Sequence, residues 1–353
     1  MKRKVVFLYT ELAAYFISCV KELAKCGVEV HIVRLPVNAE APFIFEEQTD
    51  IFLYERNSFD ETTLIHWLQN LNPHIILVSG WIDSAYLKAC DAFIKKIPRV
   101  LLMDNQWKGT WKQRLAIVVD PHKVKTRFSH VWVPGTPQAN YALKMGFRPD
   151  QIRTGFYSAD TDLFSTLYRM DLGLKSNKLL FVGRYLPFKG IANLWSAFVE
   201  LSALFPNWEL ICIGTGDEWE NRKIHPRIKH IGFVQPNQLA SYISDAAFFV
   251  MPSEKEPWGV VMHEMAAAGL PIIATTEVGA ASAFLEHEKN GFLIPPKNFE
   301  ALKNALKMAM QVSPEKYAMM QLKSRELASK LSPAIWSRTL LNLMEESILS
   351  KHD

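Results

Sequence analysis

The apolar residues of the chain fall into short uninterrupted runs, and these alternate with longer segments in which apolar positions recur every three or four residues. Such runs predict strands buried on both faces, whereas the longer spacing predicts helices with one apolar face. In the first half of the chain the predicted helices include Leu12–Cys26 and Thr62–Asn70. The predicted strands there are Val5–Tyr9, Val28–Leu35, Asp50–Tyr54, His74–Ser79, Val100–Met103, Val131–Val133 and Ile152–Gly155.

A second series of strands and helices follows Asp171–Lys178, a polar and turn-rich stretch that is our candidate linker. Two successive strand–helix–strand series predict an α/β protein with two Rossmann-like, doubly wound domains that bind a ligand in the cleft between them. We expect one domain at residues 1–170, another at 171–330 and a final amphipathic helix within 331–353. The predicted strands of the second domain are Leu179–Val182, Trp208–Ile213, Ile228–Ile231, Ala247–Met251, Ile272–Ala274 and Phe292–Ile294.

The stretch SEKEPWGVVMHEMAAAGLPII, residues 253–273, places Glu264 on a short Ala-rich helix predicted at about Val260–Ala268. A carboxylate on such a face either lies at the surface or is partly buried and has a hydrogen-bonding partner. Apolar runs on both sides favour burial, and such a helix begins at the carboxyl end of a strand, where open α/β sheets bind ligands. Glu264 and Glu256 are therefore expected to face a ligand; loop charge alone is the alternative for Glu256.

Glycines and cations follow the first two strands of the second domain. Gly183 ends the run LLFVG and is followed by Arg184 and Lys189, which bring two positive charges to one strand end. Gly214 belongs to a Gly-Thr-Gly turn after the next strand, a weak signal by itself. A diphosphate is the ligand that this arrangement favours, and a solvated surface pair is the alternative. Asn290-Gly291 is predicted to be a plain turn.

Charge and cysteine content restrict the class of protein. The net charge of +4 is too small to indicate a nucleic-acid partner, but it is compatible with a polyanionic small molecule or an anionic membrane surface. The four cysteines form no Cys-x-x-Cys pair, which favours reduced thiols in a cytoplasmic protein over a zinc site. The N-terminus does not have the pattern of a signal peptide.

The second half of the chain resembles the retaining nucleotide-sugar glycosyltransferases of family 4. The resemblance rests on four motifs in order: Phe-Val-Gly-Arg with Lys-Gly beyond it, Ile-Gly-x-Gly, Gly-Phe-Val at 232–234, and Pro-Ser-x-x-Glu-Pro-Trp-Gly with its second Glu. The resemblance covers about residues 178–295 and is faint over the first 170. It implies the GT-B fold, a UDP- or GDP-sugar donor bound mainly to the second domain and an acceptor bound mainly to the first. It also implies that the final helix crosses back to the first domain.

The same resemblance assigns roles to individual residues. Arg184 and Lys189 would contact the donor diphosphate, Glu264 the ribose hydroxyls and Glu256 the transferred sugar. The backbone amides of Trp258, Gly259 and Val260 would lie near the sugar and phosphates. Fixed cations and a helix N-terminus stabilise a departing diphosphate without a metal ion, so we expect no metal and no other cofactor. In this family the leaving phosphate is described as helping to deprotonate the acceptor.

The first domain departs from the family pattern. The first strand-to-helix loop has no glycine pair, and Asp104 and Asn105 stand where many relatives have a histidine near the sugar. Glu11, Asp104 and Asn105 are therefore candidates for an altered acceptor-side role.

Tryptophans and basic residues gather near the same strand ends. Trp81, Trp107 and Trp111 are candidates for stacking on an acceptor sugar or lying at a lipid surface, with Lys108, Lys112 and Arg114 meeting anionic groups. The alternative is a basic helix that packs its tryptophans inward.

The function that the family resemblance implies is that of a hexosyltransferase. It would move a sugar from a nucleotide-sugar, UDP-linked before GDP-linked, to a glycan or lipid-linked acceptor, in bacterial surface polysaccharide synthesis. We expect it in the cytoplasm, with peripheral contact at the inner face of the membrane as one possibility. The alternatives are a nucleotide-sugar epimerase or hydrolase on the same scaffold, and a catalytically idle binding partner.

Overall fold

The computed structural model describes residues 2–36, 48–119, 124–168 and 176–349. The chain divides into two compact units, of which unit 1 comprises Met1–Ser158 with Leu331–Asp353 and unit 2 comprises Ala159–Lys330. Most of the predicted linker at Asp171–Lys178 lies outside the described residues, as does the predicted domain boundary at 170 and 171.

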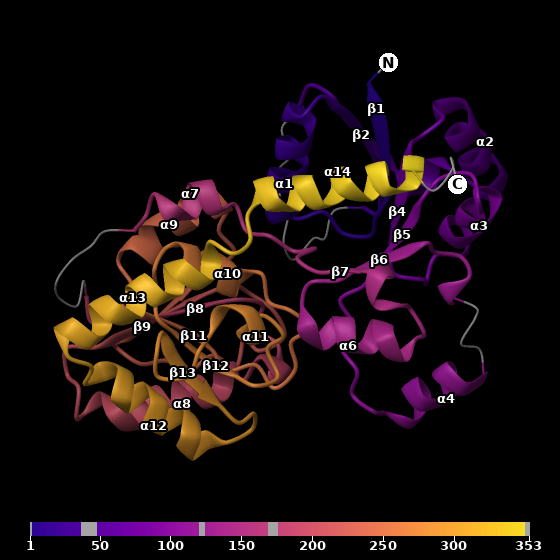
Figure 1. The fold of residues 1–353 in the computed structure, drawn as a ribbon. Coiled ribbons are helices and arrows are strands. Elements are labelled where there is room, and N and C mark those ends of the chain that lie inside the picture. Colours follow the sequence, from indigo (N-terminus) through magenta and orange to yellow (C-terminus); the bar gives the residue numbers. More distant parts are fainter. Residues whose placement is uncertain (1, 37–47, 120–123, 169–175, 350–353) are drawn as a thin grey trace. The chain divides into compact units, whose positions relative to one another are not determined.

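Unit 1 is built on a parallel sheet of seven strands in the order β3-β2-β1-β4-β5-β6-β7 (Figure 1). All seven strands predicted in the first half of the chain are present, with small shifts at their ends. The central residues of β1, β2, β4, β5 and β6 are buried, as expected of strands covered on both faces, whereas Phe52 and Leu53 of the edge strand β3 are 44% and 40% exposed. The bounds are β1 (Arg3–Leu8), β2 (Val28–Arg34), β3 (Ile51–Glu55), β4 (Ile75–Ser79), β5 (Arg99–Leu102), β6 (His130–Trp132) and β7 (Ile152–Arg153).

Two helices from opposite ends of the chain cover one face of this sheet. Helix α1 (Ala14–Lys25) packs against α14 (Pro333–Leu349), the predicted final helix. Trp336 of α14 is fully buried against Phe7 and Trp132, and its indole N–H donates to the Phe156 carbonyl oxygen at 2.7 Å. Unit 1 also contains α2 (Glu61–Leu71), α3 (Ser84–Ala92), α4 (Trp111–Val119) and α6 (Thr136–Lys144).

Unit 2 is built on a parallel sheet of six strands in the order β10-β9-β8-β11-β12-β13 (Figure 1). All six predicted strands are present. The order reverses at β8, and its neighbours β9 and β11 therefore carry crossover helices on opposite faces. The bounds are β8 (Lys178–Val182), β9 (Glu209–Ile213), β10 (Ile228–Ile231), β11 (Phe248–Met251), β12 (Ile272–Thr275) and β13 (Gly291–Ile294).

Helices α8 and α12 pack together over one face of the second sheet, and α10 packs against α13, α7 and α11. The helices of unit 2 are α7 (Thr161–Ser165), α8 (Ile191–Ser202), α9 (Pro236–Ser244), α10 (Val261–Ala267), α11 (Ala281–Phe284), α12 (Phe299–Met310) and α13 (Pro314–Ala328).

The prediction of a plain turn at Asn290-Gly291 is wrong in one respect. Asn290 is fully buried, and its side-chain amide donates to the Phe284 carbonyl at 2.9 Å and to Ser324 Oγ at 3.1 Å. The side chain therefore ties the start of β13 to α11 and α13, because a buried amide needs such partners.

Candidate functional site

The carboxyl ends of β8 and β9 approach each other through glycines. Gly183 N–H donates to the Ile213 carbonyl at 3.0 Å, and Gly214 has a φ of +134°. A Cβ atom on Gly214 would lie 2.0 Å from the Gly183 carbonyl oxygen. The predicted glycines thus permit a backbone contact that no side chain would allow.

The loop after β8 carries both predicted cations. Arg184 is exposed, whereas Lys189 closes the 3-10 turn Pro187–Lys189 and is mostly buried. Gly190, with a φ of +69°, then begins α8 against the Pro252 carbonyl, which would lie 2.3 Å from a Cβ atom at this position. The loop after β8 is therefore packed directly on the backbone that follows β11.

Lys189 and Glu256 form an ion pair in which the side chains are only 15% and 12% exposed. The backbone of Glu256 is held as well, because its N–H donates to the Glu277 carbonyl at 3.3 Å and its carbonyl accepts from Gly279 N–H at 3.1 Å. A charge pair in this setting is shielded from water more than a surface pair is. The structure thus brings together one predicted cation and one predicted carboxylate at the ends of β8 and β11.

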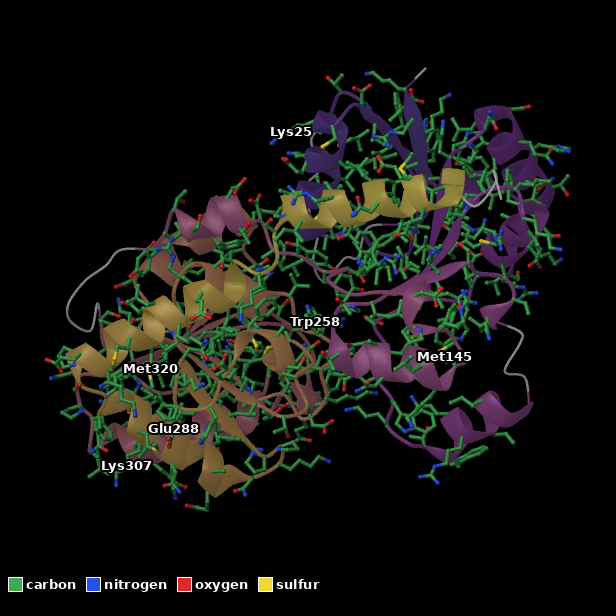
Figure 2. All side chains as sticks on the ribbon, viewed as in Figure 1. Lys25, Met145, Trp258, Glu288, Lys307 and Met320 are labelled. Atoms are coloured by element: carbon green, nitrogen blue, oxygen red, sulfur yellow. The ribbon has the colours of Figure 1, made fainter. Side chains whose placement is uncertain are left out.

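The Trp-Gly-Val turn between Glu256 and α10 is tightly packed. Trp258, labelled in Figure 2, is buried to 2% exposure, and its carbonyl accepts from Ala280 N–H at 3.0 Å. Gly259 has a φ of +93°, and a Cβ atom there would lie 2.8 Å from Met251 Cε. Val260 is the N-cap of α10, so the predicted helix is confirmed within a residue at each end.

Glu264 lies on α10 and is partly buried, as predicted for a carboxylate with a ligand nearby. Within the described part of the chain, its carboxylate has no hydrogen-bond or ion-pair partner. Burial raises the pKa of Glu264 to about 7, and the negative charge of Asp160 adds to the effect. A half-buried carboxylate without a protein partner is a group that a hydroxyl-bearing ligand would stabilise.

Asp160 is a site residue whose effect on Glu264 the sequence did not indicate. Its carboxylate caps α7 by accepting from Leu163 N–H at 3.1 Å, and α7 packs against α10. The family resemblance gave one signal, because the Asn-Gly-Val-Asp segment of the family stands here as Tyr-Ser-Ala-Asp, at 157–160, and retains the Asp.

The neighbouring His263 is a packing residue. It is fully buried and stacks on Phe284 at 4.2 Å, and its Nδ1 accepts from Ala159 N–H at 2.9 Å.

The acceptor-side candidates all follow strands of unit 1, but they differ in surroundings. Glu11 and Asn105 are exposed, and Trp81 is half-buried against the core. Asp104, after β5, is half-buried and accepts from the Tyr157 hydroxyl at 3.4 Å.

Tyrosines surround Asp104. The ring of Tyr157 meets that of Tyr15 edge-on at 5.5 Å. Burial raises the pKa of Tyr157 and of Tyr9 well above the usual value, and the charge of Asp104 contributes to both shifts. These phenols therefore keep their protons at neutral pH and act as hydrogen-bond donors.

The tryptophans near α4 divide into one inward and one outward residue. Trp107 is half-buried, and its ring lies 5.6 Å from that of Tyr141. Trp111 is 69% exposed at the start of α4, with Lys108, Lys112 and Arg114 exposed nearby. The alternative in which this helix packs its tryptophans inward is therefore wrong for Trp111, the tryptophan on α4, whereas Trp107 precedes the helix and packs against the core.

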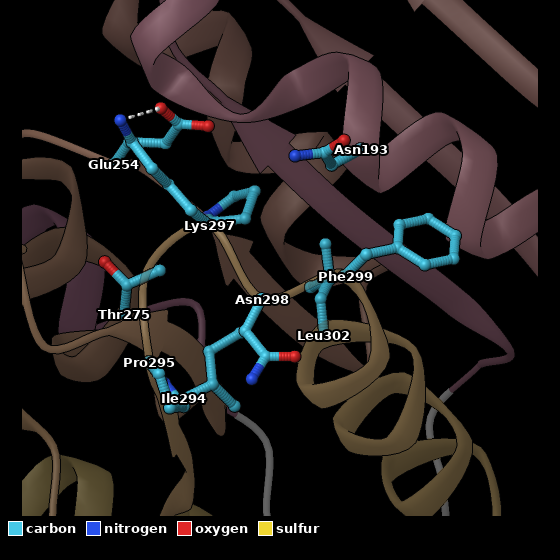
Figure 3. Close-up of a pocket in the computed structure, with 10 residues that line it drawn as sticks. Asn193, Glu254, Thr275, Ile294, Pro295, Lys297, Asn298, Phe299 and Leu302 are labelled. Atoms are coloured by element: carbon cyan, nitrogen blue, oxygen red, sulfur yellow. Dashed lines mark ion pairs between the residues drawn. The ribbon is translucent and has the colours of Figure 1, made fainter.

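A small pocket lies beside the site, at the carboxyl ends of β12 and β13 (Figure 3). Thr275, Asn298 and Asn193 line it, and the ion pair between Lys297 and Glu254 stands at its edge. Within the described residues there is no group of three or more His, Cys, Asp or Glu side chains suited to a metal ion. None of the described helices is long and apolar enough to cross a membrane.

Part of the chain is similar to known glycosyltransferases. Residues 169–327 match the family Glycosyl transferases group 1. An uncharacterized glycosyltransferase of Haemophilus influenzae is 31% identical over 157 residues, which are 43% of this chain and 44% of that protein. A D-inositol 3-phosphate glycosyltransferase of Jonesia denitrificans is 30% identical over 59% of this chain and 48% of that protein. The match thus covers less than half the length of each of these two relatives.

Solved structures match over nearly the whole chain. A glycosyltransferase from Rickettsia africae has a TM-score of 0.77 at 16% identity, covering 98% of this chain and 99% of that one. HepE from Anabaena in complex with UDP and glucose has a TM-score of 0.70 at 18% identity, covering 98% of this chain and 100% of that one. The predicted GT-B fold, with two Rossmann-like α/β domains, is confirmed, and the residues that match the group 1 glycosyl transferases fall almost entirely in unit 2.

Proposed function

We propose that the protein is a hexosyltransferase that moves a sugar from a nucleotide-sugar donor to a glycan or lipid-linked acceptor. The observation that carries the proposal is the joint placement of Arg184, Lys189, Glu256 and Glu264 after β8 and β11 of a group 1 domain. The two cations suit a ligand with negative charge, and the two carboxylates suit a ligand with hydroxyl groups. A nucleoside diphosphate sugar has each of these.

The proposed chemistry follows from the charges. Cleavage of the sugar–phosphate bond leaves negative charge on the diphosphate, and fixed cations at Arg184 and Lys189 stabilise it without a metal ion. Glu256, already paired with Lys189, accepts hydrogen bonds from the transferred sugar, and Glu264 accepts them from the ribose diol. The sugar keeps its configuration, and the leaving phosphate takes the acceptor proton. UDP is favoured over GDP because HepE, a protein of the same fold, is described in complex with UDP and glucose.

A thermal-shift panel of UDP, GDP, ADP and their sugar conjugates tests this proposal, because a ligand that binds only the folded state raises apparent stability. We expect the largest shift with the UDP series, retained with EDTA present and reduced in Arg184→Ala. A transfer assay with radiolabelled UDP-sugar then separates transfer from donor turnover without acceptor, which the epimerase and hydrolase alternatives predict. Absence of any shift would favour the idle scaffold.

The surface around α4 supports a second element of the proposal, contact with anionic lipid. Trp111 and Leu115 are 69% and 52% exposed, and three exposed cations surround them. An aromatic residue among cations is the combination that binds the interface of an anionic membrane. This surface also suits a lipid-linked acceptor in surface polysaccharide synthesis.

Cosedimentation with anionic and with neutral vesicles tests the lipid contact. The triple substitution Lys108→Ala, Lys112→Ala and Arg114→Ala should lower binding to anionic vesicles only. Its matched control removes the three exposed lysines Lys25, Lys95 and Lys96 from the same unit. An equal loss of vesicle binding in both variants would mean that binding depends on net charge and not on the surface around α4.

A further inference from the structure

A buried aromatic group lies directly beneath the loops that hold Gly183, Arg184 and Gly214. Its centre is Tyr185, which is fully buried although it follows the exposed Arg184. The ring of Tyr185 contacts Trp195 of α8 at 5.6 Å and Trp219 of the loop after β9 at 5.4 Å. The side chain of Tyr185 thus joins helix α8 to the loop after β9.

The backbone of Tyr185 makes the same connection. Its N–H donates to the Thr215 carbonyl at 2.8 Å, and its carbonyl accepts from Glu218 N–H at 2.9 Å. Gly216 has a φ of +146°, and a Cβ atom there would lie 2.7 Å from the Tyr185 carbonyl oxygen. Both polar backbone atoms of Tyr185 are therefore bound to residues 215–218.

The Tyr185 hydroxyl completes the connection at the far side of the ring. It lies 3.1 Å from the Cys212 carbonyl, at the end of β9, and 3.1 Å from Nδ1 of His230 in β10. Nε2 of His230 lies 3.0 Å from the Lys223 carbonyl, so this nitrogen carries the proton of a neutral ring and Nδ1 is an acceptor. The hydroxyl proton is then shared between two acceptors on neighbouring strands. Burial raises the pKa of Tyr185, so the proton stays on the hydroxyl.

We propose that Tyr185, with His230 as its partner, is a positioning residue that fixes the Gly183–Lys189 loop and the Gly214–Trp219 loop in one arrangement for binding the donor diphosphate. Tyr185 touches no substrate and acts through the backbone of Arg184 and Gly214. This inference rests on the proposed function for its ligand but not for the coupling of the two loops. Loss of the hydroxyl leaves the backbone hydrogen bonds of residue 185 in place but weakens the connection between the loops, so the donor binds with a larger entropic cost.

The test compares Tyr185→Phe with Tyr317→Phe. Tyr317 is equally buried in unit 2, and its hydroxyl donates to the Ala247 carbonyl at 3.0 Å, away from both loops. Amide hydrogen exchange is expected to rise about fivefold at residues 214–219 in Tyr185→Phe, which corresponds to one net hydrogen bond, and to stay unchanged there in Tyr317→Phe. The dissociation constant of UDP by calorimetry should rise by a similar factor in Tyr185→Phe alone, with kcat at saturating donor nearly unchanged.

Each outcome decides one question. Equal exchange at residues 214–219 in the two variants would overturn the positioning role, whatever the ligand. Should wild-type protein bind no UDP while exchange still rises in Tyr185→Phe, the proposed donor is wrong and the coupling of the loops stands. His230→Phe keeps Tyr185 intact but removes the Nδ1 acceptor, so it should also raise exchange at residues 214–219, which guards against a folding defect in the first variant.

Discussion

The strand ends of the two sheets are built from different groups, backbone in unit 2 and side chains in unit 1, although both sheets are parallel and doubly wound. In unit 2 the strand ends meet through main chain, because Gly190 and Gly214 lie so close to carbonyl oxygens that a Cβ atom would be 2.3 and 2.0 Å from them. In unit 1 the glycine after β4, Gly80, has open space around it, and side chains such as Tyr157 and Asp104 occupy the strand ends instead. A surface made of backbone and fixed cations suits a constant ligand such as diphosphate. A surface made of side chains can vary with the acceptor.

Breaking the ion pair between Lys189 and Glu256 in unit 2 should have the largest effect, and the effect should be on activity. Lys189→Ala is expected to lower kcat about 1,000-fold, because it removes a cation from the leaving group and leaves Glu256 partly buried without its charge partner. Steady-state kinetics with a saturating UDP-sugar measure this. Lys229→Ala removes a lysine paired with Glu209 at 3.0 Å in the same unit and serves as the control. Similar losses in both variants would contradict the assignment.

Gly214→Ala against Gly80→Ala compares the two sheets directly. Both positions have positive φ, so both substitutions carry a backbone strain of about 1 kcal/mol. Only the Cβ atom at 214 also collides with a carbonyl oxygen, and the total cost there should reach about 3 kcal/mol. Urea unfolding measures both values. Equal costs would mean that the strand ends of unit 2 are no more tightly packed than those of unit 1.

Glu264 makes the stability of unit 2 depend on pH. With a pKa of about 7 instead of the ordinary 4.5, the folded protein keeps a proton that the unfolded chain releases, so stability falls as pH rises from 4.5 to 7. Glu264→Gln removes this loss and should stabilise the protein by about 2 kcal/mol at pH 8, with little change at pH 4.5. Thermal unfolding across this range measures the difference. The same substitution should weaken UDP binding, which a purely structural glutamate would not do.

The sequence predicted all the strands because short apolar runs mark them, a property that depends on local pattern alone, although the edge strands β3, β7 and β10 are only partly buried. The partial burial of Glu264 was also predicted from local pattern, because a carboxylate on an Ala-rich helix between two apolar runs is unusual. The sequence did not predict the ion pair between Lys189 and Glu256, because the two residues lie on different loops and no local pattern fixes the distance between their side chains. The effect of Asp160 on Glu264 and the contact of Tyr157 with Asp104 were missed for the same reason. The exposure of Trp111 was left open, because an amphipathic pattern does not say what covers the apolar face.

Removing one hydroxyl from unit 1 should have the smallest effect and would sharpen the comparison most. The 3.4 Å contact from Tyr157 to Asp104 is long, so Tyr157→Phe should lower the free energy of unfolding by about 0.5 kcal/mol. Tyr54→Phe, which removes a hydroxyl 3.0 Å from His31 Nδ1 in the same unit, is the control for stability. If Asp104 meets the acceptor, Tyr157→Phe should raise the acceptor KM about fivefold and leave UDP affinity unchanged, the reverse of the pattern for Tyr185→Phe. A change in UDP affinity in Tyr157→Phe, with the acceptor KM unaltered, would contradict the division of labour between the two sheets.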